Sequence, residues 1–391
     1  MSIRDAAEAR TPSYVERLGR LVGIDSGSRD LVGLREAANV LAGWCTLAGL
    51  STHLVPVHDA AAAPLGDAVV ARIRGTGSKR ILLAGHLDTV FTAGTAAARP
   101  FRVDGARALG PGVCDDKGGV LAGLCAVETL LDNGRTAFGE LILVATPDEE
   151  IGSIGSRALL GRLAASADVA LCLECARENG DLVSARKGVA DIELVLRGRA
   201  AHAGIEPERG ANAALAAARL TIALQELNGR WPSVTVNVGV LQAGQRANVV
   251  ADQARLVVDV RADRTDAFDE ALAAIDALSQ ESYVDGVAAE LSLHAPTPPW
   301  ERSAATRRLV ELAAKVGAGI GVEVQDAATG GCADANLFAA AGLAVLDGLG
   351  PIGGNDHSTD EWLDLTSVPD RVALLAGLVD AAAQDCVEVE A

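Results

Sequence analysis

Up to about residue 185, short apolar runs alternate along the chain with longer stretches in which the apolar positions have helical spacing. One such stretch, 118–134, carries apolar side chains at helical spacing and ends at Asn133 and Gly134, which predicts a helix with a C-terminal stop. We predict strands for the apolar runs at 67–75, 80–88, 139–150 and 168–175. Strands that alternate with helices are typical of an α/β domain whose sheet carries helices on its faces.

A different pattern runs from residue 188 to residue 299. In order, it predicts a strand within 188–204, a helix at 210–229, strands within 231–244 and 253–263, a helix at 264–281 and a strand at 287–294. This order of strands and helices is the split βαβ arrangement, an α+β ferredoxin-like unit.

The α/β pattern resumes after a Pro-rich segment at 294–300, with a helix near 303–317 and a strand within 342–351. We therefore predict a domain at 188–299, inserted between two parts of an outer domain at 1–187 and 300–391.

Length and charge narrow the class of protein. A chain of 391 residues exceeds one ordinary core, which favours two domains. Lys and Arg total 34 against 52 Asp and Glu, and the resulting formal charge of −18 argues against nucleic acid or an anionic membrane as partner. No apolar run has the length of a membrane span, and residues 1–21 lack the apolar core of a secretory signal, so we expect a soluble cytoplasmic protein.

The seven cysteines are scattered singly, except for Cys172 and Cys175. This distribution fits reduced thiols rather than a disulfide framework. A redox CxxC motif is one interpretation of the pair, and we favour the other, in which the thiols pack as small buried hydrophobic side chains.

Isolated imidazole and carboxylate groups stand at five strand ends or loops of the outer domain. His86 and Asp88 are two positions apart at a strand end, so both side chains lie on one face. The other groups are Asp115 and Asp116 in "GPGVCDDKGG", Glu149 and Glu150 in "TPDEEIGS", Glu174 in "LCLEC", and His357 in "GPIGGNDHSTDEW". Taken singly, each has an ordinary explanation: a structural histidine, a helix N-cap or a solvated turn.

Ligands of open α/β sheets collect at the carboxyl ends of strands, so these groups can converge from distant parts of the sequence. Several carboxylates close together would repel one another unless a cation is bound among them. Histidine and carboxylate ligands favour zinc or a similar divalent ion. Two histidines and three carboxylates are too many for one tetrahedral site and suit two metals that share one carboxylate.

These motifs resemble those of the di-zinc aminoacylase and carboxypeptidase family, which includes bacterial glutamate carboxypeptidase, acetylornithine deacetylase and succinyl-diaminopimelate desuccinylase. The resemblance covers nearly the whole chain. It rests on "GHLDTV", "GPGVCDDKGG", "TPDEEIGS", "LEC", "GRAAHAG", "DVRAD", "TGGCADAN" and "GGNDHS", in the order of the family. It implies a catalytic domain with a central mixed sheet and flanking helices, and an inserted dimerisation or lid domain.

The resemblance also implies roles for single residues. Asp115 would bridge two zinc ions per subunit, although cobalt or manganese can compete for such ligands. His86 and Glu174 would complete one metal site, and Glu150 and His357 the other.

The neighbours of these ligands would have other roles. Asp88 would orient His86, and Glu149 would act as general base on a zinc-bridging hydroxide. Asp116 has no such role in the family, and we expect it to be structural. In "GGCADAN", Cys332 and Ala333 stand near a Thr of the family pattern, which affects substrate contacts rather than the metal site.

Three residues of the inserted domain match functional positions of the family. His202 would donate a hydrogen bond to the oxyanion in the active site of a partner subunit, and Asn248 and Arg261 would contact the carboxylate of the substrate. Ordinary structural roles are the alternatives: His202 would be a loop histidine bonded to a carbonyl, and Arg261 would form a cross-strand ion pair. Arg186 and Lys187, at the predicted hinge between the domains, are expected to form a solvated basic turn, with substrate contact as the less favoured alternative. The family also implies a homodimer formed through the inserted domain.

We therefore expect a zinc-dependent hydrolase that cleaves an amide bond next to a free carboxylate in a small peptide or N-acyl amino acid, with glutamate carboxypeptidase-like specificity. One alternative is an N-acyl amino acid deacylase of the acetylornithine deacetylase or desuccinylase type. Another is a non-catalytic, metal-containing dimeric binding protein. A nucleotide-binding enzyme is disfavoured, because "GPGVCDDKGG" lacks the dinucleotide and phosphate-loop spacings.

Overall fold

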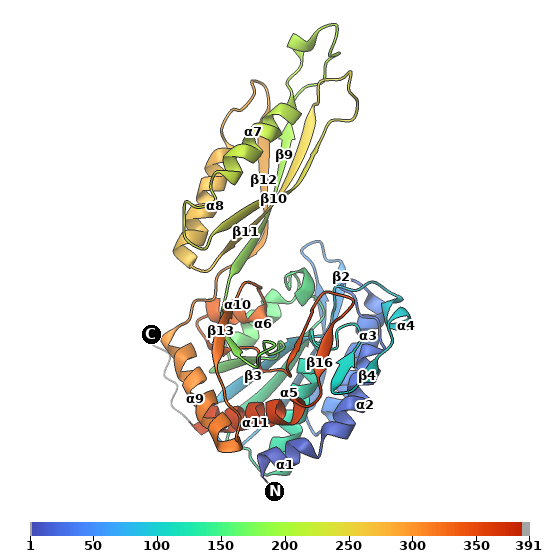
Figure 1. Cartoon of the computed structure of the whole chain (residues 1–391), viewed down its shortest axis with the longest axis vertical. Helices are drawn as coiled ribbons and strands as arrows, with labels where there is room; N and C mark the ends of the chain where they lie inside the picture. The colour runs from blue at the N-terminus through green and yellow to red at the C-terminus, as the bar shows by residue number, and fades with distance from the viewer. Residues whose placement is uncertain (1, 385–391) are drawn as a thin grey trace. The chain divides into compact units, whose positions relative to one another are not determined.

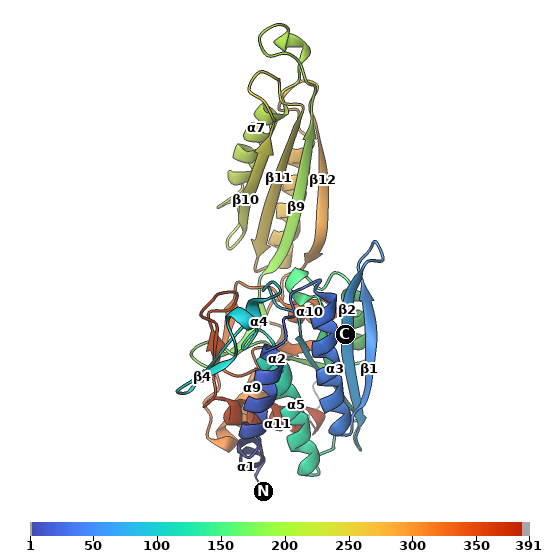
Figure 2. The same cartoon turned by 90° about the vertical axis from the view of Figure 1, so that its right-hand side faces the viewer.

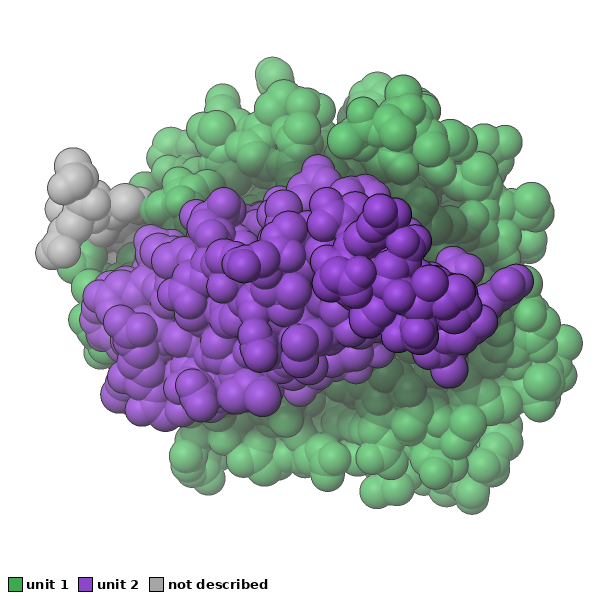
Figure 3. Space-filling model, turned by 90° about the horizontal axis from the view of Figure 1, so that it is seen from above, with its two compact units in different colours: residues 1–184, 302–329, 333–391 green, residues 185–301, 330–332 purple. Residues whose placement is uncertain are grey.

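The chain forms two units in the computed structural model, which describes residues 2–384. The first comprises Met1–Ser184, Arg302–Thr329 and Ala333–Ala391, and the second comprises Ala185–Glu301 and Gly330–Cys332 (Figure 3, green and purple). Each unit has a hydrophobic core of its own, as separate domains do. None of the described helices combines the length and the apolar character needed to cross a membrane.

The first unit is built around a six-stranded mixed sheet. Across the sheet its strands are β1 (Ser51–His58), β2 (Pro64–Arg74), β6 (Glu140–Thr146), β3 (Arg80–His86), β7 (Val169–Cys172) and β14 (Ala344–Leu346). Strand β3 is parallel to both β6 and β7, and β14 is parallel to β7. The carboxyl ends of β3, β6 and β7 therefore meet at one edge of the sheet.

Helices cover this sheet (Figures 1 and 2). Helices α5 and α11 contact β3, and α3 lies along β1 and β2. Side chains of β3 are buried on both faces, since Ile81 and Leu83 alternate with the equally buried Leu82 and Ala84. The helices of this unit are α1 (Ile3–Glu8), α2 (Thr11–Val22), α3 (Leu31–Leu47), α4 (Thr95–Ala98), α5 (Lys117–Asp132), the 3₁₀ helix η1 (Glu149–Ile151), α6 (Arg157–Ala164), α9 (Ala304–Ile320), α10 (Asp334–Ala340) and α11 (Val368–Gln384).

Short strands complete the first unit. A four-stranded sheet has the order β15 (Gly353–Gly354), β16 (Trp362–Asp364), β5 (Arg107–Leu109) and β4 (Arg102–Asp104), and β8 (Leu182–Arg186) pairs with β13 (Asp326–Thr329). Because β16 pairs with β5, the loop around His357 is held beside the loop around Asp115. Strands of two or three residues carry no hydrophobic periodicity, so the sequence did not predict this sheet.

The second unit contains a four-stranded antiparallel sheet with the order β10-β11-β9-β12. Its elements are β9 (Gly188–Arg197), the 3₁₀ helix η2 (Pro207–Arg209), α7 (Ala213–Gln225), β10 (Thr235–Ala243), β11 (Gln253–Ala262), α8 (Thr265–Ser279) and β12 (Ala288–Thr297). Alternate residues of β11, such as Leu256 and Val258, are buried in a common core with α7 and α8. The α/β fold with a separate antiparallel-sheet unit, predicted from the hydrophobic pattern, is confirmed.

Differences from the predicted elements are confined to their ends. The apolar run at 139–150 forms a strand only to Thr146, because Glu149 and Glu150 turn into η1. The helix predicted from residue 210 begins at Ala213, because the Asn212 side chain accepts a hydrogen bond from the amide of Leu215 and caps it.

Candidate metal centre

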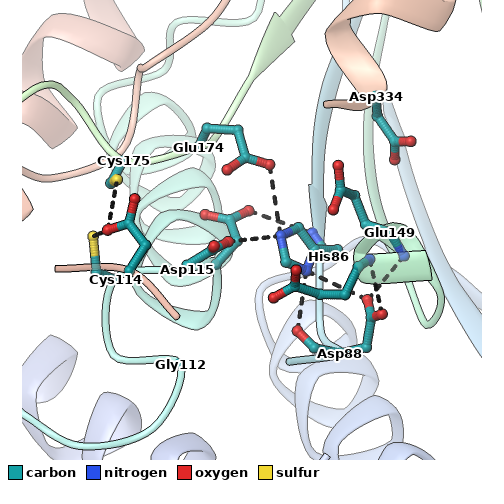
Figure 4. Close-up of polar contacts among 12 residues, drawn as sticks. His86, Asp88, Gly112, Cys114, Asp115, Glu149, Glu174, Cys175 and Asp334 are labelled. Atoms are coloured by element: carbon teal, nitrogen blue, oxygen red, sulfur yellow. Dashed lines mark hydrogen bonds and ion pairs between the residues drawn. The ribbon is translucent and has the colours of Figure 1, made fainter. Parts of the chain in front are cut away.

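Five predicted ligands come together at the carboxyl edge of the central sheet, and Figure 4 shows His86, Asp115 and Glu174 among them. His86 is the last residue of β3, and each of the others lies in a loop or turn that follows a strand. The five are His86, Asp115, Glu150, Glu174 and His357. Their convergence follows from the parallel arrangement of β3, β6 and β7 and from the pairing of β16 with β5.

Asp115 lies at the middle of the group, with one oxygen directed to each histidine. Its Oδ1 is 2.9 Å from Nε2 of His86, and its Oδ2 is 3.2 Å from Nε2 of His357. Glu174 Oε1 lies 3.6 Å from Nε2 of His86, and Glu150 Oε2 lies 3.1 Å from Nε2 of His357. The side chains thus form two sets of donors that share one carboxylate.

Charge around the two histidines is strongly negative. Burial alone would lower the pKa of His86, yet hydrogen bonds with Asp115 and Asp88 raise it well above its ordinary value. The pKa of His357 is raised to about 11, because its imidazole bonds to Asp115 and Glu150. Carboxylates that hold protons this firmly on imidazoles would hold divalent cations in their place.

Asp116 also approaches this group. Its Oδ2 accepts a hydrogen bond from the backbone amide of His86, 3.3 Å away, and its buried Oδ1 has no hydrogen-bond partner among the described residues. Donor atoms of His86, Asp116 and Glu174 lie within 4.8 Å of one another. An orphaned buried carboxylate oxygen and converging nitrogen and oxygen donors fit bound divalent cations.

Two glycines make room for Asp116. A Cβ atom on Gly85 would lie 2.3 Å from Asp116 Oδ2, and one on Gly119 would lie 2.1 Å from Oδ1. Any larger residue at these positions would displace the carboxylate. Asp116 is therefore fixed by close backbone packing on both sides.

The buried residue Asp88 organises the surroundings of His86. Nδ1 of His86 lies 3.1 Å from the carbonyl oxygen of Asp88 and 3.4 Å from its Oδ1. The Asp88 carboxylate also accepts the amides of Glu149 and Glu150, at 3.0 and 3.1 Å, and the hydroxyl of Ser28. Because Nδ1 is held by residue 88, Nε2 is the nitrogen that faces the carboxylates.

Glu149 lies next to the five candidate ligands but is not one of them. Burial raises its pKa well above the ordinary glutamate value, and the neighbouring charges of Glu174 and Asp334 raise it further. Asp334, at the start of α10, is itself buried, which raises its pKa to about 6, and it accepts a hydrogen bond from the Ser153 hydroxyl. A carboxyl group in this setting can hold and release a proton next to the metal-binding groups.

The sequence pattern did not distinguish Glu361, although this residue holds the Asp115 loop. Its buried carboxylate accepts three backbone amides, from Gly112 and Cys114 at 2.9 Å and from Asp115 at 3.1 Å. Burial raises its pKa to about 7. The only signal in the sequence is an acidic residue close to His357 in "HSTDEW", which by itself reads as a solvated turn.

The remaining predicted site residues lie in the second unit, at two different ends of its sheet. His202 and Asn248 are neighbours, because residue 202 forms a bridge with residue 249 and Ala203 donates to the carbonyl of Asn248. Both side chains are exposed. Asn248 lies in the loop before β11, whereas Arg261 lies near the end of this ten-residue strand, roughly 30 Å along it.

Arg261 is engaged by groups of its own unit. Its Nε lies 3.1 Å from Asp259 Oδ1, and its Nη1 donates to the carbonyl of Gly330. The ion pair thus runs along one strand rather than across two. The prediction of a solvated basic turn is wrong for Arg186, which is buried and donates to the carbonyl of Gly331, whereas Lys187 donates to that of Ser233.

Comparison with known proteins finds relatives that match nearly the whole chain. The model of peptidase family M20/M25/M40 matches residues 82–381. Carboxypeptidase G2 from Pseudomonas sp. (strain RS-16) is 31% identical over 380 residues, which cover 96% of this chain and 90% of that protein. Acetylornithine deacetylase from Myxococcus xanthus is 34% identical over 200 residues, 48% of this chain and 50% of that protein. The crystal structure of an aminopeptidase from Bacillus cereus has the same fold, with a TM-score of 0.77 and 22% identity over 95% of this chain and 99% of that one.

Proposed function

This chain belongs to peptidase family M20/M25/M40, and from that premise we propose that it hydrolyses an amide bond next to a free carboxylate. The substrate is a small peptide or an N-acyl amino acid, with glutamate as the preferred residue on the carboxylate side. The similarity to carboxypeptidase G2 over nearly the full length of both chains supports a carboxypeptidase activity. The placement of Asp115 between two histidines is the observation that carries the proposal.

Two divalent cations would be held by the clustered side chains. His86, Asp115 and Glu174 would hold one, and His357, Asp115 and Glu150 the other. When bound, such a pair polarises the carbonyl of the amide and lowers the pKa of the attacking water. Zinc suits these ligands, and cobalt and manganese are alternatives.

Glu149 is the proposed general base. It would take a proton from the attacking water and later deliver it to the nitrogen of the leaving amine as the carbon–nitrogen bond breaks. Its burial supports this assignment, because a raised pKa lets the carboxyl group retain the proton between the two transfers. Asp88 would orient His86 and, through the amide of Glu149, the base as well.

We assign His202, Asn248 and Arg261 to substrate binding across a dimer. The chain enters and leaves the second unit near Arg261, where residue 186 bridges residue 300 and Arg261 contacts Gly330. His202 and Asn248 lie at the opposite end of the sheet, roughly 30 Å from Arg261, so one chain cannot bring all three side chains to the same small substrate, and a partner subunit would supply one of the two ends. In such a dimer His202 would reach the active site of the partner subunit and donate a hydrogen bond to the oxyanion, and Arg261 would bind the substrate carboxylate.

An apolar surface on the second unit supports a homodimer. Leu215 and Ile222, seven positions apart on α7, are 44% and 61% exposed, and Leu241 on β10 is 48% exposed. Helix α7 contacts β10, which is an edge strand of the sheet. An edge strand beside exposed leucine and isoleucine is a surface that a second copy would cover.

The proposal is tested by measuring bound zinc per chain together with hydrolysis of N-acyl-glutamates, before and after chelation. We expect at least about two zinc ions, loss of activity on chelation and recovery on adding zinc back. Matched amides without the free carboxylate should be cleaved poorly. Full activity of the metal-free protein would overturn the proposal. Turnover that depends on the N-acyl group rather than on the glutamate would indicate a deacylase. Tight substrate binding without turnover would indicate a binding protein.

A further inference from the structure

Two thiols and a carboxylate converge immediately beside the candidate metal centre. Sγ of Cys114 lies 3.7 Å from Oδ1 of Asp356, and Sγ of Cys175 lies 3.9 Å from the same oxygen. The donor atoms of these three residues all lie within 4.8 Å of one another. Figure 4 shows Cys114 and Cys175 on the side of Asp115 away from His86.

This thiol cluster, Cys114, Cys175 and Asp356, is built by the segments that carry the proposed zinc ligands. Cys114 precedes Asp115, Cys175 follows Glu174, and Asp356 precedes His357. None of the three is a proposed ligand of the metal centre. Consecutive side chains in irregular or extended backbone point in different directions, so the same three loops present a second set of donors.

The cluster is closed on one side and open on the other. Cys114 is buried, Cys175 is partly buried and Asp356 is exposed. A Cβ atom on Gly353 would lie 2.3 Å from Sγ of Cys114, so backbone packs directly against this thiol. An ion would therefore enter past Asp356, where water can supply a further ligand.

We propose that the thiol cluster is a third metal site, separate from the proposed catalytic pair and independent of the proposed function. Its two thiolates and one carboxylate, with water as fourth ligand, suit a thiophilic divalent cation such as Zn²⁺ or Cd²⁺. Both thiols release their protons on binding.

The distances agree with this donor set. A sulfur about 2.3 Å and an oxygen about 2.1 Å from a tetrahedral zinc lie roughly 3.6 Å apart. The two observed sulfur–oxygen distances, 3.7 and 3.9 Å, are close to this value. A cation held there would join the three loops that carry Asp115, Glu174 and His357.

The test is a titration of the protein already loaded with two equivalents of zinc, using Cd²⁺ alone as the probe. We expect one further cadmium per chain, the ultraviolet absorption of a thiolate–cadmium bond, and no release of zinc. Cys114→Ser and Cys175→Ser should each lose about half of this absorption, since one of the two thiolates is gone, and bind cadmium at least about tenfold more weakly. Cys45→Ser removes a buried thiol outside the cluster and should behave as wild type.

Asp356→Asn provides a second test in case the cysteine variants fail to fold, because it leaves both thiols in place. It should keep the absorption and weaken cadmium binding about tenfold. The proposal is overturned if cadmium displaces zinc, if the absorption survives undiminished in Cys175→Ser, or if the Asp356 variant binds as tightly as wild type. It is overturned equally if the isolated protein holds a Cys114–Cys175 disulfide, seen as two fewer free thiols under non-reducing conditions.

Discussion

The carboxylate of Asp88 accepts a hydrogen bond from the backbone amide of Glu149, with 3.0 Å between Glu149 N and Asp88 Oδ1. The other oxygen of Asp88 accepts the amide of Glu150 at 3.1 Å. Nδ1 of His86 is held by the carbonyl of the same residue. A single buried residue, through its carbonyl and its carboxylate, thus couples the end of β3 to the turn after β6, and with it a proposed metal ligand to the proposed base.

Asp88→Asn should weaken metal binding about 10- to 100-fold, because outer partners of this kind orient the ligands themselves. The amide nitrogen of an asparagine cannot accept a hydrogen bond, so one of the two amides at Glu149 and Glu150 would lose its acceptor. Competition with a chelator measures the affinity. The matched control is Asp59→Asn, which alters a carboxylate that also accepts two backbone amides, from Ala61 and Ala63, in the turn between β1 and β2. Equal losses in both variants would contradict the prediction.

Glu149→Gln should lower kcat by about two to four orders of magnitude, the usual contribution of a general base. Bound metal should stay near the wild-type amount, since Glu149 is outside the two donor sets. Glu150→Gln, one residue further on, should instead lose metal, because its Oε2 lies 3.1 Å from Nε2 of His357. Elemental analysis and steady-state kinetics on the same samples separate the two effects. The reverse pattern would mean that base and ligand are interchanged.

Glu361→Ala should destabilise the protein by at least about 1 to 3 kcal/mol, the cost of one unsatisfied buried amide, because it leaves three buried amides without their acceptor. Metal affinity should fall as well, since the amide of Asp115 is one of the three. Glu361→Gln retains one acceptor oxygen and should lie between wild type and Glu361→Ala in both measurements. Urea unfolding and chelator competition provide the two values. Wild-type metal affinity in Glu361→Ala would show that the Asp115 loop holds its shape without this residue.

The convergence of His86, Glu150 and Glu174 was predictable, because strand ends in an open α/β sheet share one edge and each of these residues stands at or just after the end of an apolar run. The approach of Asp115 to His357 depends on the pairing of β16 with β5, which hydrophobic periodicity does not predict.

Glu361 was not predictable, because its partners are backbone amides of a loop about 250 residues away, and such contacts leave no periodicity. The contact between Asp116 and His86 was not predictable from the sequence for a related reason. It depends on the space left by Gly85 and Gly119, which only the packed structure reveals.

The thiol cluster was not predictable from the sequence either. The spacing of Cys172 and Cys175 drew attention to that pair, because it is short along the chain. The fold brings Cys175 close to Cys114 instead, by joining the loop after β7 to the loop before α5. Spacing along a chain predicts contacts within one element, whereas contacts between loops depend on the arrangement of the strands.

Asp334→Asn should change how stability depends on pH in the metal-free protein. Burial raises the pKa of Asp334 to about 6 from its ordinary value of 3.8. Between these values the folded protein holds a proton that the unfolded chain has lost, so this residue lowers the free energy of unfolding as the pH rises from about 4 to about 6. The variant lacks this contribution and should gain stability relative to wild type over that interval.

Urea unfolding of both proteins at several pH values in chelator measures the difference. Asp269→Asn, an exposed change on α8, provides the control and should show no such trend. A constant difference between Asp334→Asn and wild type from pH 4 to pH 6 would contradict the prediction.

Mixing two inactive variants tests whether His202 acts on the partner subunit. His202→Ala should lower kcat about 100- to 1,000-fold, as loss of one oxyanion donor does, and Glu149→Gln should be inactive for lack of the base. In a mixed dimer, one active site receives an intact Glu149 from one chain and an intact His202 from the other. Random exchange makes about half of the dimers mixed, with one complete site each, so roughly a quarter of wild-type activity should return. Mixing Glu149→Gln with Glu150→Gln, both changes in the first unit, should restore none. Activity that stays at the level of the separate variants, in samples shown to have exchanged subunits, would place His202 in the active site of its own chain.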